Sequence, residues 1–204
     1  MAFGKYAVDY EARIDYDRLR KERLQRAKDQ MSADGMGAII TWNEANIRYL
    51  TSYYVTTPMR PAEVQLVFCP RNGDPVLFAG GTPKETERRM PWMEGRVKPM
   101  LGAPVLTAGD ADDFFIMVTV ETIANLMAEH GLENEPLGIE GTVLQGLYFE
   151  AFRKKGINVV HGKPTMDAAR MIKTEDEIEL MRITCANSES AFTAIADAIR
   201  PGIR

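Results

Sequence analysis

Histidine and cysteine are scarce in this sequence, which contains only two of each among its 204 residues. Neither His130 nor His161 has a second histidine or a carboxylate at helical ligand spacing, so a zinc site is not expected. Cys69 ends an apolar run and Cys185 lies on the apolar stripe of a helix, and we expect both to be buried free thiols. Because no disulfide framework can form, the sequence favours a reducing cytoplasm.

Long stretches of one charge or of apolar residues are also missing. The net charge is -4, and the most basic stretch, residues 18–28, includes Glu22 and is typical of a solvated helix face. Nucleic-acid binding is therefore not expected. No apolar run approaches the ~20 residues of a membrane span, and the first residues turn polar at once, so we expect no signal peptide. With 45% hydrophobic residues, the chain can form a soluble globular domain with its own core.

Patterns typical of several catalytic sites are absent as well. The glycine pair at 80–81 lacks the spacing and the lysine of a phosphate loop, and no nucleophile elbow is present. Asp110, Asp112 and Asp113 form an acidic cluster that we interpret as a loop ending in a helix cap rather than as a metal site. Glu140 is the one carboxylate found at a strand end, and a single carboxylate does not make a two-metal nuclease site.

The sequence does contain alternating strand and helix patterns. Strands are predicted at 38–41, 64–69, 75–79, 96–101, 137–140 and 157–160. The Asn-Gly pair at 72–73 indicates a hairpin between the second and third strands. Helices are predicted at about 15–33, from 82, from 112 to before 131, and from 142 to 156. Strand–helix alternation in the second half implies parallel crossovers. We therefore predict one α/β domain with a mixed sheet, antiparallel in its first part and parallel in its second, and helices on its faces.

Capping patterns predict where these helices begin, and residue spacing predicts which residues share one side of each helix. Capping boxes are predicted at Thr82, Thr142 and Thr174, each followed three residues later by Glu or Gln. The residues predicted to share one side are Leu24, Ala27 and Met31 in the first helix, and Met117, Val120, Ala124 and Met127 in the helix that starts near 112.

A long helix is predicted from 174 to about 200. Its apolar stripe consists of Ile178, Met181, Cys185, Phe192, Ile195 and Ile199. Its length of roughly 40 Å exceeds a domain diameter of roughly 30 Å. Two interpretations are open: the helix lies along the sheet domain, or its stripe packs on a part of the protein beyond the given sequence. We favour the second, because an exposed apolar stripe of this size normally marks a missing partner.

Three segments in register carry a family resemblance. They are residues 46–51 (Asn-Ile-Arg-Tyr-Leu-Thr), residues 169–182 around Ile-Lys-Thr-Glu-Asp-Glu, and Arg-Pro-Gly at 200–202. Their order and spacing resemble the amino-terminal half of creatinase, prolidase and aminopeptidase P, the pita-bread metalloenzymes. The resemblance covers nearly the whole chain. It implies a ribonuclease-H-like amino-terminal domain at 1–172 and a linker helix at 173–204 that leads into a catalytic domain.

The resemblance also locates the chemistry. It implies two divalent metal ions held by two Asp, one His and two Glu of the catalytic domain, which we expect beyond the given sequence. We therefore assign no catalytic residue, metal ligand or cofactor to this chain. In creatinase-like dimers, an arginine after the 46–51 motif reaches the partner's active site and contacts a substrate carboxylate, and Arg60 stands at the corresponding place. A guanidinium suits this role because it can donate two parallel hydrogen bonds; an ordinary surface arginine is the alternative.

A second candidate comes from the Arg-Arg-Met-Pro-Trp run at 88–92. This run is similar to creatinase-like members and to dimethylsulfoniopropionate lyases of the same fold. Trp92 either lines the partner's active site or anchors a helix end to the core. We favour the anchor, because tryptophan is mostly buried in any domain.

We therefore expect the non-catalytic, substrate-capping and dimerisation domain of a cytoplasmic Xaa-Pro dipeptidase or aminopeptidase P-like hydrolase. Its partners would be the catalytic domain, a second subunit and a small peptide or other carboxylate-bearing substrate, with no nucleic acid and no membrane. The same domain of a creatinase or a dimethylsulfoniopropionate lyase is an alternative, because these enzymes share this front half. A free-standing binding or dimerisation module is an alternative of another class.

Overall fold

A computed structural model describes residues 14–54, 65–102, 111–142 and 144–202. The chain divides into two compact units. The sheet unit consists of residues 23–171, and the second unit joins the described residues 14–22 to 172–202. The helix α1 (Tyr16–Ala33) begins in the second unit and continues into the sheet unit.

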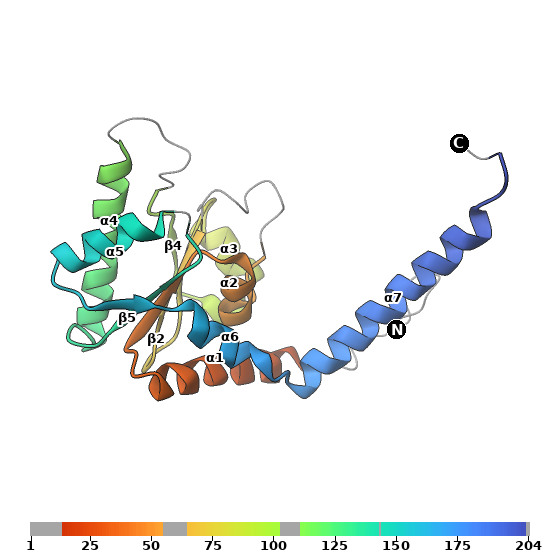
Figure 1. The fold of residues 1–204 in the computed structure, drawn as a ribbon, viewed down its shortest axis with the longest axis horizontal. Coiled ribbons are helices and arrows are strands. Elements are labelled where there is room, and N and C mark those ends of the chain that lie inside the picture. The colour runs from red at the N-terminus through yellow and green to blue at the C-terminus, as the bar shows by residue number, and fades with distance from the viewer. Residues whose placement is uncertain (1–13, 55–64, 103–110, 143, 203–204) are drawn as a thin grey trace. The chain divides into compact units, whose positions relative to one another are not determined.

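The sheet unit is built on six strands in the order β4-β3-β2-β1-β5-β6 (Figure 1). They are β1 (Ala38–Thr41), β2 (Gln65–Pro70), β3 (Val76–Ala79), β4 (Val97–Pro99), β5 (Leu137–Glu140) and β6 (Val159–His161). The strands β1, β2 and β3 pair antiparallel, whereas β5 pairs parallel with both β1 and β6. The predicted mixed α/β sheet is confirmed. One pairing was not predicted: β3 and β4 are also parallel, because α3 (Pro83–Arg89) makes a crossover between them.

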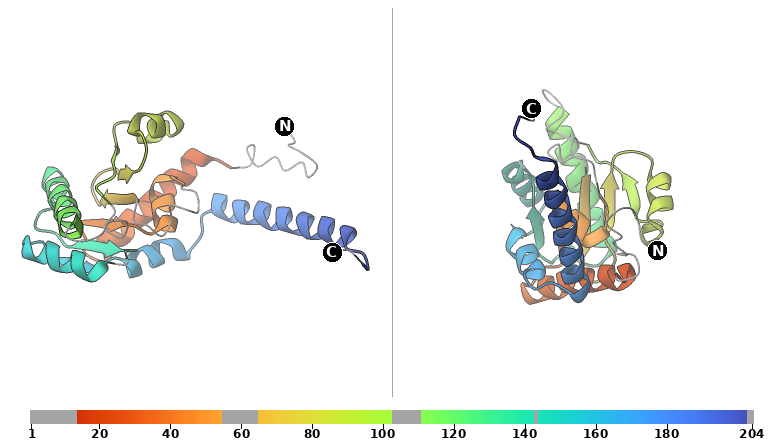
Figure 2. Two further views of the ribbon diagram at one scale, coloured as in Figure 1. Left: turned by 90° about the horizontal axis from the view of Figure 1, so that it is seen from above. Right: turned by 90° about the vertical axis from the view of Figure 1, so that its right-hand side faces the viewer.

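Helices cover both faces of this sheet (Figures 1 and 2). One face packs against α4 (Ala111–Glu129) and α5 (Gln145–Lys154). The other packs against the second half of α1, α2 (Glu44–Thr51), the short 3-10 helix η2 (Pro91–Met93) and α6 (Lys163–Met171). The strand β2 shows the division: Leu66 and Phe68 join the first core cluster, and Val67 and Cys69 the second. Successive side chains of a strand point to opposite sides. Both faces are buried because helices cover each of them.

Several local predictions are corrected by the structure. Thr82 stands at the N-cap of α3 without a side-chain capping bond, so the predicted capping box is wrong there, and the Glu85 carboxylate pairs with Arg88. The capping box predicted at Thr142 is also wrong: α5 begins at Gln145 without a side-chain capping bond, and the Thr142 hydroxyl oxygen accepts from the Leu144 N–H at 3.1 Å instead. Ala27 and Met31 are fully buried, as predicted. Met117, in contrast, is 54% exposed, and the buried face of α4 consists of Ile116, Thr119, Val120, Ile123 and Met127.

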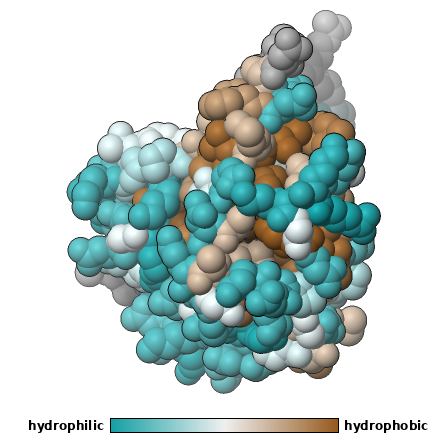
Figure 3. Space-filling view, turned by 90° about the vertical axis from the view of Figure 1, so that its left-hand side faces the viewer, coloured by the Kyte–Doolittle hydropathy of each residue, from teal (hydrophilic) through white to brown (hydrophobic). Residues whose placement is uncertain are grey.

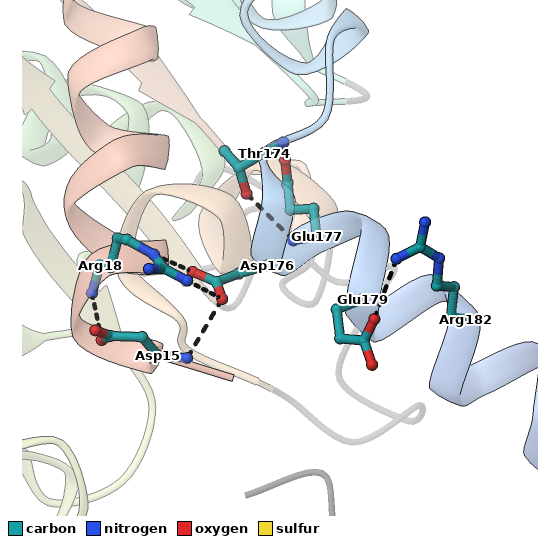
Figure 4. A network of polar contacts seen from close by, with 7 residues as sticks. All are labelled: Asp15, Arg18, Thr174, Asp176, Glu177, Glu179 and Arg182. Carbon is teal, nitrogen blue, oxygen red and sulfur yellow. Dashed lines mark hydrogen bonds and ion pairs between the residues drawn. The ribbon is translucent and has the colours of Figure 1, made fainter. Parts of the chain in front are cut away.

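The second unit holds the start of α1 and the long helix α7 (Glu175–Ala198). The capping box at Thr174 is confirmed: its hydroxyl accepts from the Glu177 N–H, and the Glu177 carboxylate accepts from the Thr174 N–H (Figure 4). A small apolar cluster packs the two helices together. Its members are Ile14, Leu19, Ile183 and Leu180.

The predicted apolar stripe of α7 is exposed. Its large side chains range from 42% exposed at Ile178 to 71% at Phe192. Cys185 is exposed too, so its predicted burial is wrong, whereas Cys69 is fully buried as expected. Ile183, in contrast, is buried, because it lies on the side of α7 that packs against α1. Among the helices described, none is long and apolar enough to span a membrane.

Candidate functional site

The carboxyl end of α2 gives the predicted site its starting point. Asn43 begins α2, because its side chain accepts hydrogen bonds from the N–H groups of Ala45 and Asn46. Ser52 ends the helix in the left-handed conformation, with φ of 62°, and its N–H donates to the Arg48 carbonyl at 2.8 Å. The helix α2 therefore ends at Ser52, and Tyr53 and Tyr54 follow it directly.

Trp92 fixes this point from the neighbouring η2. Its indole Nε1 donates to the Thr51 carbonyl oxygen at 2.9 Å, which satisfies a carbonyl at the open end of α2. The ring is partly buried against the core cluster that includes Met90 and Met93. Arg96 in turn donates to the Trp92 carbonyl. The geometry thus gives Trp92 an anchoring contact to a helix end, and a contact with substrate stays a prediction.

Two tyrosines and two arginines lie around the same helix end. The guanidinium of Arg48 stands 5.2 Å from the centre of the Tyr54 ring. Burial raises the pKa of the Tyr53 phenol above its usual value, and the positive charge of Arg89 partly opposes this rise. Tyr53 therefore stays protonated at neutral pH and can donate a hydrogen bond. Arg60 itself lies outside the described residues, within 55–64.

Two of the three segments behind the family resemblance meet in the sheet unit. The Arg170 Nη1 donates to the Oδ1 of Asn46, which is buried, at 2.6 Å. The Tyr49 hydroxyl donates to the Ala169 carbonyl at 3.1 Å. Guanidinium groups of Arg23 and Arg170 stand 5.4 and 5.9 Å from the Tyr49 ring centre. The sequence indicated both segments but not this junction, which joins α2 to α6 across 120 or more residues.

The described residues contain no cluster of three or more His, Cys, Asp or Glu that could hold a metal ion. Glu140 is buried at the end of β5 and accepts a hydrogen bond from the Thr41 hydroxyl of β1. This pair ties two parallel strands together. Asp112 and Asp113 lie in the first turn of α4, where acidic side chains suit the helix dipole.

Comparison with known proteins points to one family. The creatinase/prolidase N-terminal domain family matches residues 23–172, nearly the same residues as the sheet unit. The dimethylsulfoniopropionate lyase DddP of Roseovarius nubinhibens is 25% identical over 215 positions, which cover 100% of this chain and 45% of the lyase.

Solved structures of two relatives have the same fold. The Xaa-Pro dipeptidase from Bacillus anthracis superimposes with a TM-score of 0.55 and 18% identity, covering 90% of this chain and 45% of that one. The prolidase from Pyrococcus horikoshii OT3 gives 0.54 and 19%, covering 90% and 44%. The chain thus spans less than half the length of each of these three relatives.

Proposed function

The chain belongs to the creatinase/prolidase N-terminal domain family, and from this premise we propose that it is the non-catalytic, substrate-capping domain of a Xaa-Pro dipeptidase or aminopeptidase P-like hydrolase. The match of the family to residues 23–172 carries the proposal. The prolidase and dipeptidase folds support it. The catalytic groups and two divalent ions would belong to a segment outside this sequence.

Within the intact enzyme, the proposed role of this domain is to position the substrate. Arg60 would hold the substrate carboxylate in the partner subunit of a homodimer, through two parallel hydrogen bonds. Trp92 would line the same site and keep the end of α2 in place through its bond to Thr51. Precise placement matters because a small displacement of a binding group lowers the rate strongly. We place this enzyme in the cytoplasm.

Substitution in the dimeric enzyme that contains this chain tests the proposal. Arg60→Ala should raise KM for a Xaa-Pro dipeptide roughly 10- to 100-fold, because a hydrogen bond to a charged group contributes about 1.5–3 kcal/mol. KM for the matching Xaa-Pro amide, which lacks the carboxylate, should change less than about threefold by the same reasoning. Trp92→Phe keeps an aromatic ring but removes the indole N–H that donates to Thr51. It should therefore raise KM for the dipeptide and for the amide alike. Equal losses for dipeptide and amide in Arg60→Ala would exclude the carboxylate role.

A dimethylsulfoniopropionate lyase is the second candidate. The observation in its favour is the match to DddP, which covers the whole chain at 25% identity, compared with 18–19% for the two solved peptidases. Release of dimethyl sulfide from dimethylsulfoniopropionate by the intact enzyme, without hydrolysis of Xaa-Pro dipeptides, would favour the lyase. Both substrates carry a carboxylate, so the role of Arg60 is common to the two candidates.

A further inference from the structure

An apolar groove lies at one edge of the sheet, between β4 and α4. Its volume is about 350 Å³. The strand β4 is the outermost strand beside β3. Trp92 packs with the core cluster on the other face of the sheet, whereas Phe78, which lines the groove, belongs to the cluster under α4. The groove is therefore separate from the site at the end of α2.

The walls of the groove come from three elements. Phe78 of β3 pairs with Lys98 of β4, and directly paired residues of neighbouring strands point to the same face. The side chain of Lys98 therefore leaves the sheet on the same side as the Phe78 ring. Val118, Thr122 and Leu126 form the opposite wall, and their spacing of four residues makes them one ridge of α4. The Thr122 hydroxyl donates to the Val118 carbonyl at 2.8 Å, so its proton is engaged within the helix.

Lys98 is the one charged residue in this lining, and no carboxylate of the described residues pairs with it. Each of the other five lysines in the sheet unit, all of them described, forms an ion pair with a carboxylate. These are Lys28, Lys84, Lys154, Lys155 and Lys163. Lys98 has no ion pair among the described residues, although it stands beside an apolar surface. A free cation next to an apolar groove is complementary to a ligand that combines an apolar body with an anionic group.

The surroundings and the size of the groove agree with such a ligand. Apolar side chains gather on one face of the molecule (Figure 3). Met100, which lines the groove, is 38% exposed, and Phe114 and Met117 of α4 are 56% and 54% exposed. A volume of 350 Å³ falls within the range of roughly 300–1,000 Å³ typical of small-molecule pockets. The groove is therefore large enough to hold a small molecule.

We propose that this groove binds a small amphiphilic anion, such as a medium-chain carboxylate. The aliphatic chain lies on Phe78 and along the ridge of α4, where it is removed from water. The carboxylate lies at the outer end of the Lys98 side chain. This site does not depend on the proposed enzyme class, because it uses neither Arg60 nor Trp92.

Titration of the 204-residue chain with octanoate and with octan-1-ol, followed by ¹H–¹⁵N NMR, tests the proposal. Octanoate should shift the amides of Lys98, Met100 and Leu101 and of 118, 122 and 126 saturably, with a Kd on the order of 0.1–1 mM for a ligand of this size. Lys98→Met keeps the apolar stem and removes the charge. It should weaken octanoate roughly two- to fivefold, the upper part of the range of an exposed ion pair, and leave the affinity for octan-1-ol unchanged. Lys84→Met, at a lysine whose side chain is 92% exposed on α3, is the matched control and should change neither ligand.

A variant that fills the groove gives a second, independent readout. Thr122→Trp places a large ring in the groove, which Thr122 lines, and should abolish saturable binding of both ligands, while the circular dichroism spectrum stays unchanged. The proposal is overturned if octanoate causes no saturable shifts in the lining residues. It is equally overturned if Lys98→Met weakens octanoate and octan-1-ol to the same extent, since the cation would then play no part.

Discussion

Gln65 is a buried polar residue of the sheet unit whose side-chain amide makes no hydrogen bond to the described residues. This first residue of β2 is 2% exposed, and neither its Oε1 nor its Nε2 has a hydrogen-bond partner among the described residues. It lies on the same side of β2 as Val67 and Cys69, because alternate residues of a strand share a face, and that side packs against α2. Buried polar groups are nearly always paired, so an unpaired amide lowers the stability of the fold.

Gln65→Met should therefore stabilise the protein. Methionine has a similar length and no group that requires a hydrogen bond, so the free energy of unfolding should rise by about 1–3 kcal/mol. Urea unfolding followed by circular dichroism measures the change. Thr41→Val is the matched control at another buried strand position. Its hydroxyl donates to Glu140, so that variant should be less stable. A loss of stability in Gln65→Met would mean that the amide is paired in solution.

Individual contacts were the least predictable part of this protein. Trp92 was expected to anchor a helix end, but its partner Thr51 lies 41 residues away and no local pattern connects them. The buried side of α4 was misjudged for a different reason. This helix is apolar around much of its circumference, so spacing alone did not separate exposed Met117 from buried Ile116. Which apolar residue is buried was decided by the sheet beneath the helix.

The start of α7 is held to the start of α1 by a charged contact (Figure 4). Asp176 accepts from Arg18 Nε at 2.8 Å and from Arg18 Nη2 at 2.7 Å, and its side chain is 2% exposed. The hydrogen bond from Arg18 lowers the pKa of Asp176; burial opposes this effect, and a bond from the Asp15 N–H adds to it. A carboxylate whose pKa is lower when folded stabilises the fold above its unfolded pKa of about 3.9, and this stabilisation is lost as the pH falls through the folded value.

Asp176→Asn should lower the free energy of unfolding by about 1–3 kcal/mol at pH 7, because it removes a hydrogen-bonded charge. The deficit should persist to about pH 5 and shrink below about pH 4, where Asp176 takes up a proton in the unfolded chain and then, at still lower pH, in the folded protein. Urea unfolding at pH 7, 5 and 3 measures it. Glu179→Gln is the matched control in the same helix: its pair with the more exposed Arg182, at 3.3 Å, should contribute less than about 0.5 kcal/mol. An equal deficit for Asp176→Asn at pH 3 and pH 7 would rule out the ion pair as its cause.

At the scale of helices and strands, the sequence predicted most of what forms. β1 and β5 were placed residue for residue, and the capping box of α7 was correct, because these signals are local. The helices α2 and α6 were missed. Both are short, with 8 and 9 residues, and helices of this length depend on tertiary packing rather than on intrinsic propensity. Their mutual contacts through Asn46, Tyr49 and Arg170 provide that packing.

For the whole molecule, the mixed sheet and the family could be predicted, but the complete site could not. Turn chemistry at 72–73 and strand–helix alternation specified the antiparallel and the parallel halves. The three separated segments specified the family. The division at 172 into a domain and a linker helix stays a prediction, and in the structure residues 14–22 group with the linker. The substrate contact of Arg60 and the partner subunit stay predictions, because Arg60 lies outside the described residues.

Metal binding and hydrolysis by the whole 204-residue chain test whether the catalytic groups lie outside it. A metal-activated hydroxide requires several ligands that converge on one ion, and the described residues provide no such group. The 204-residue chain should therefore neither bind Mn²⁺, Co²⁺ or Zn²⁺ stoichiometrically in calorimetry nor hydrolyse Xaa-Pro dipeptides when these ions are added. The longer enzyme that we propose contains this chain, assayed in parallel, is the positive control. Turnover by the chain above a mock preparation would show that it carries catalytic groups of its own. Inactivity of both proteins toward dipeptides, combined with dimethyl sulfide release by the longer one, would favour the lyase candidate.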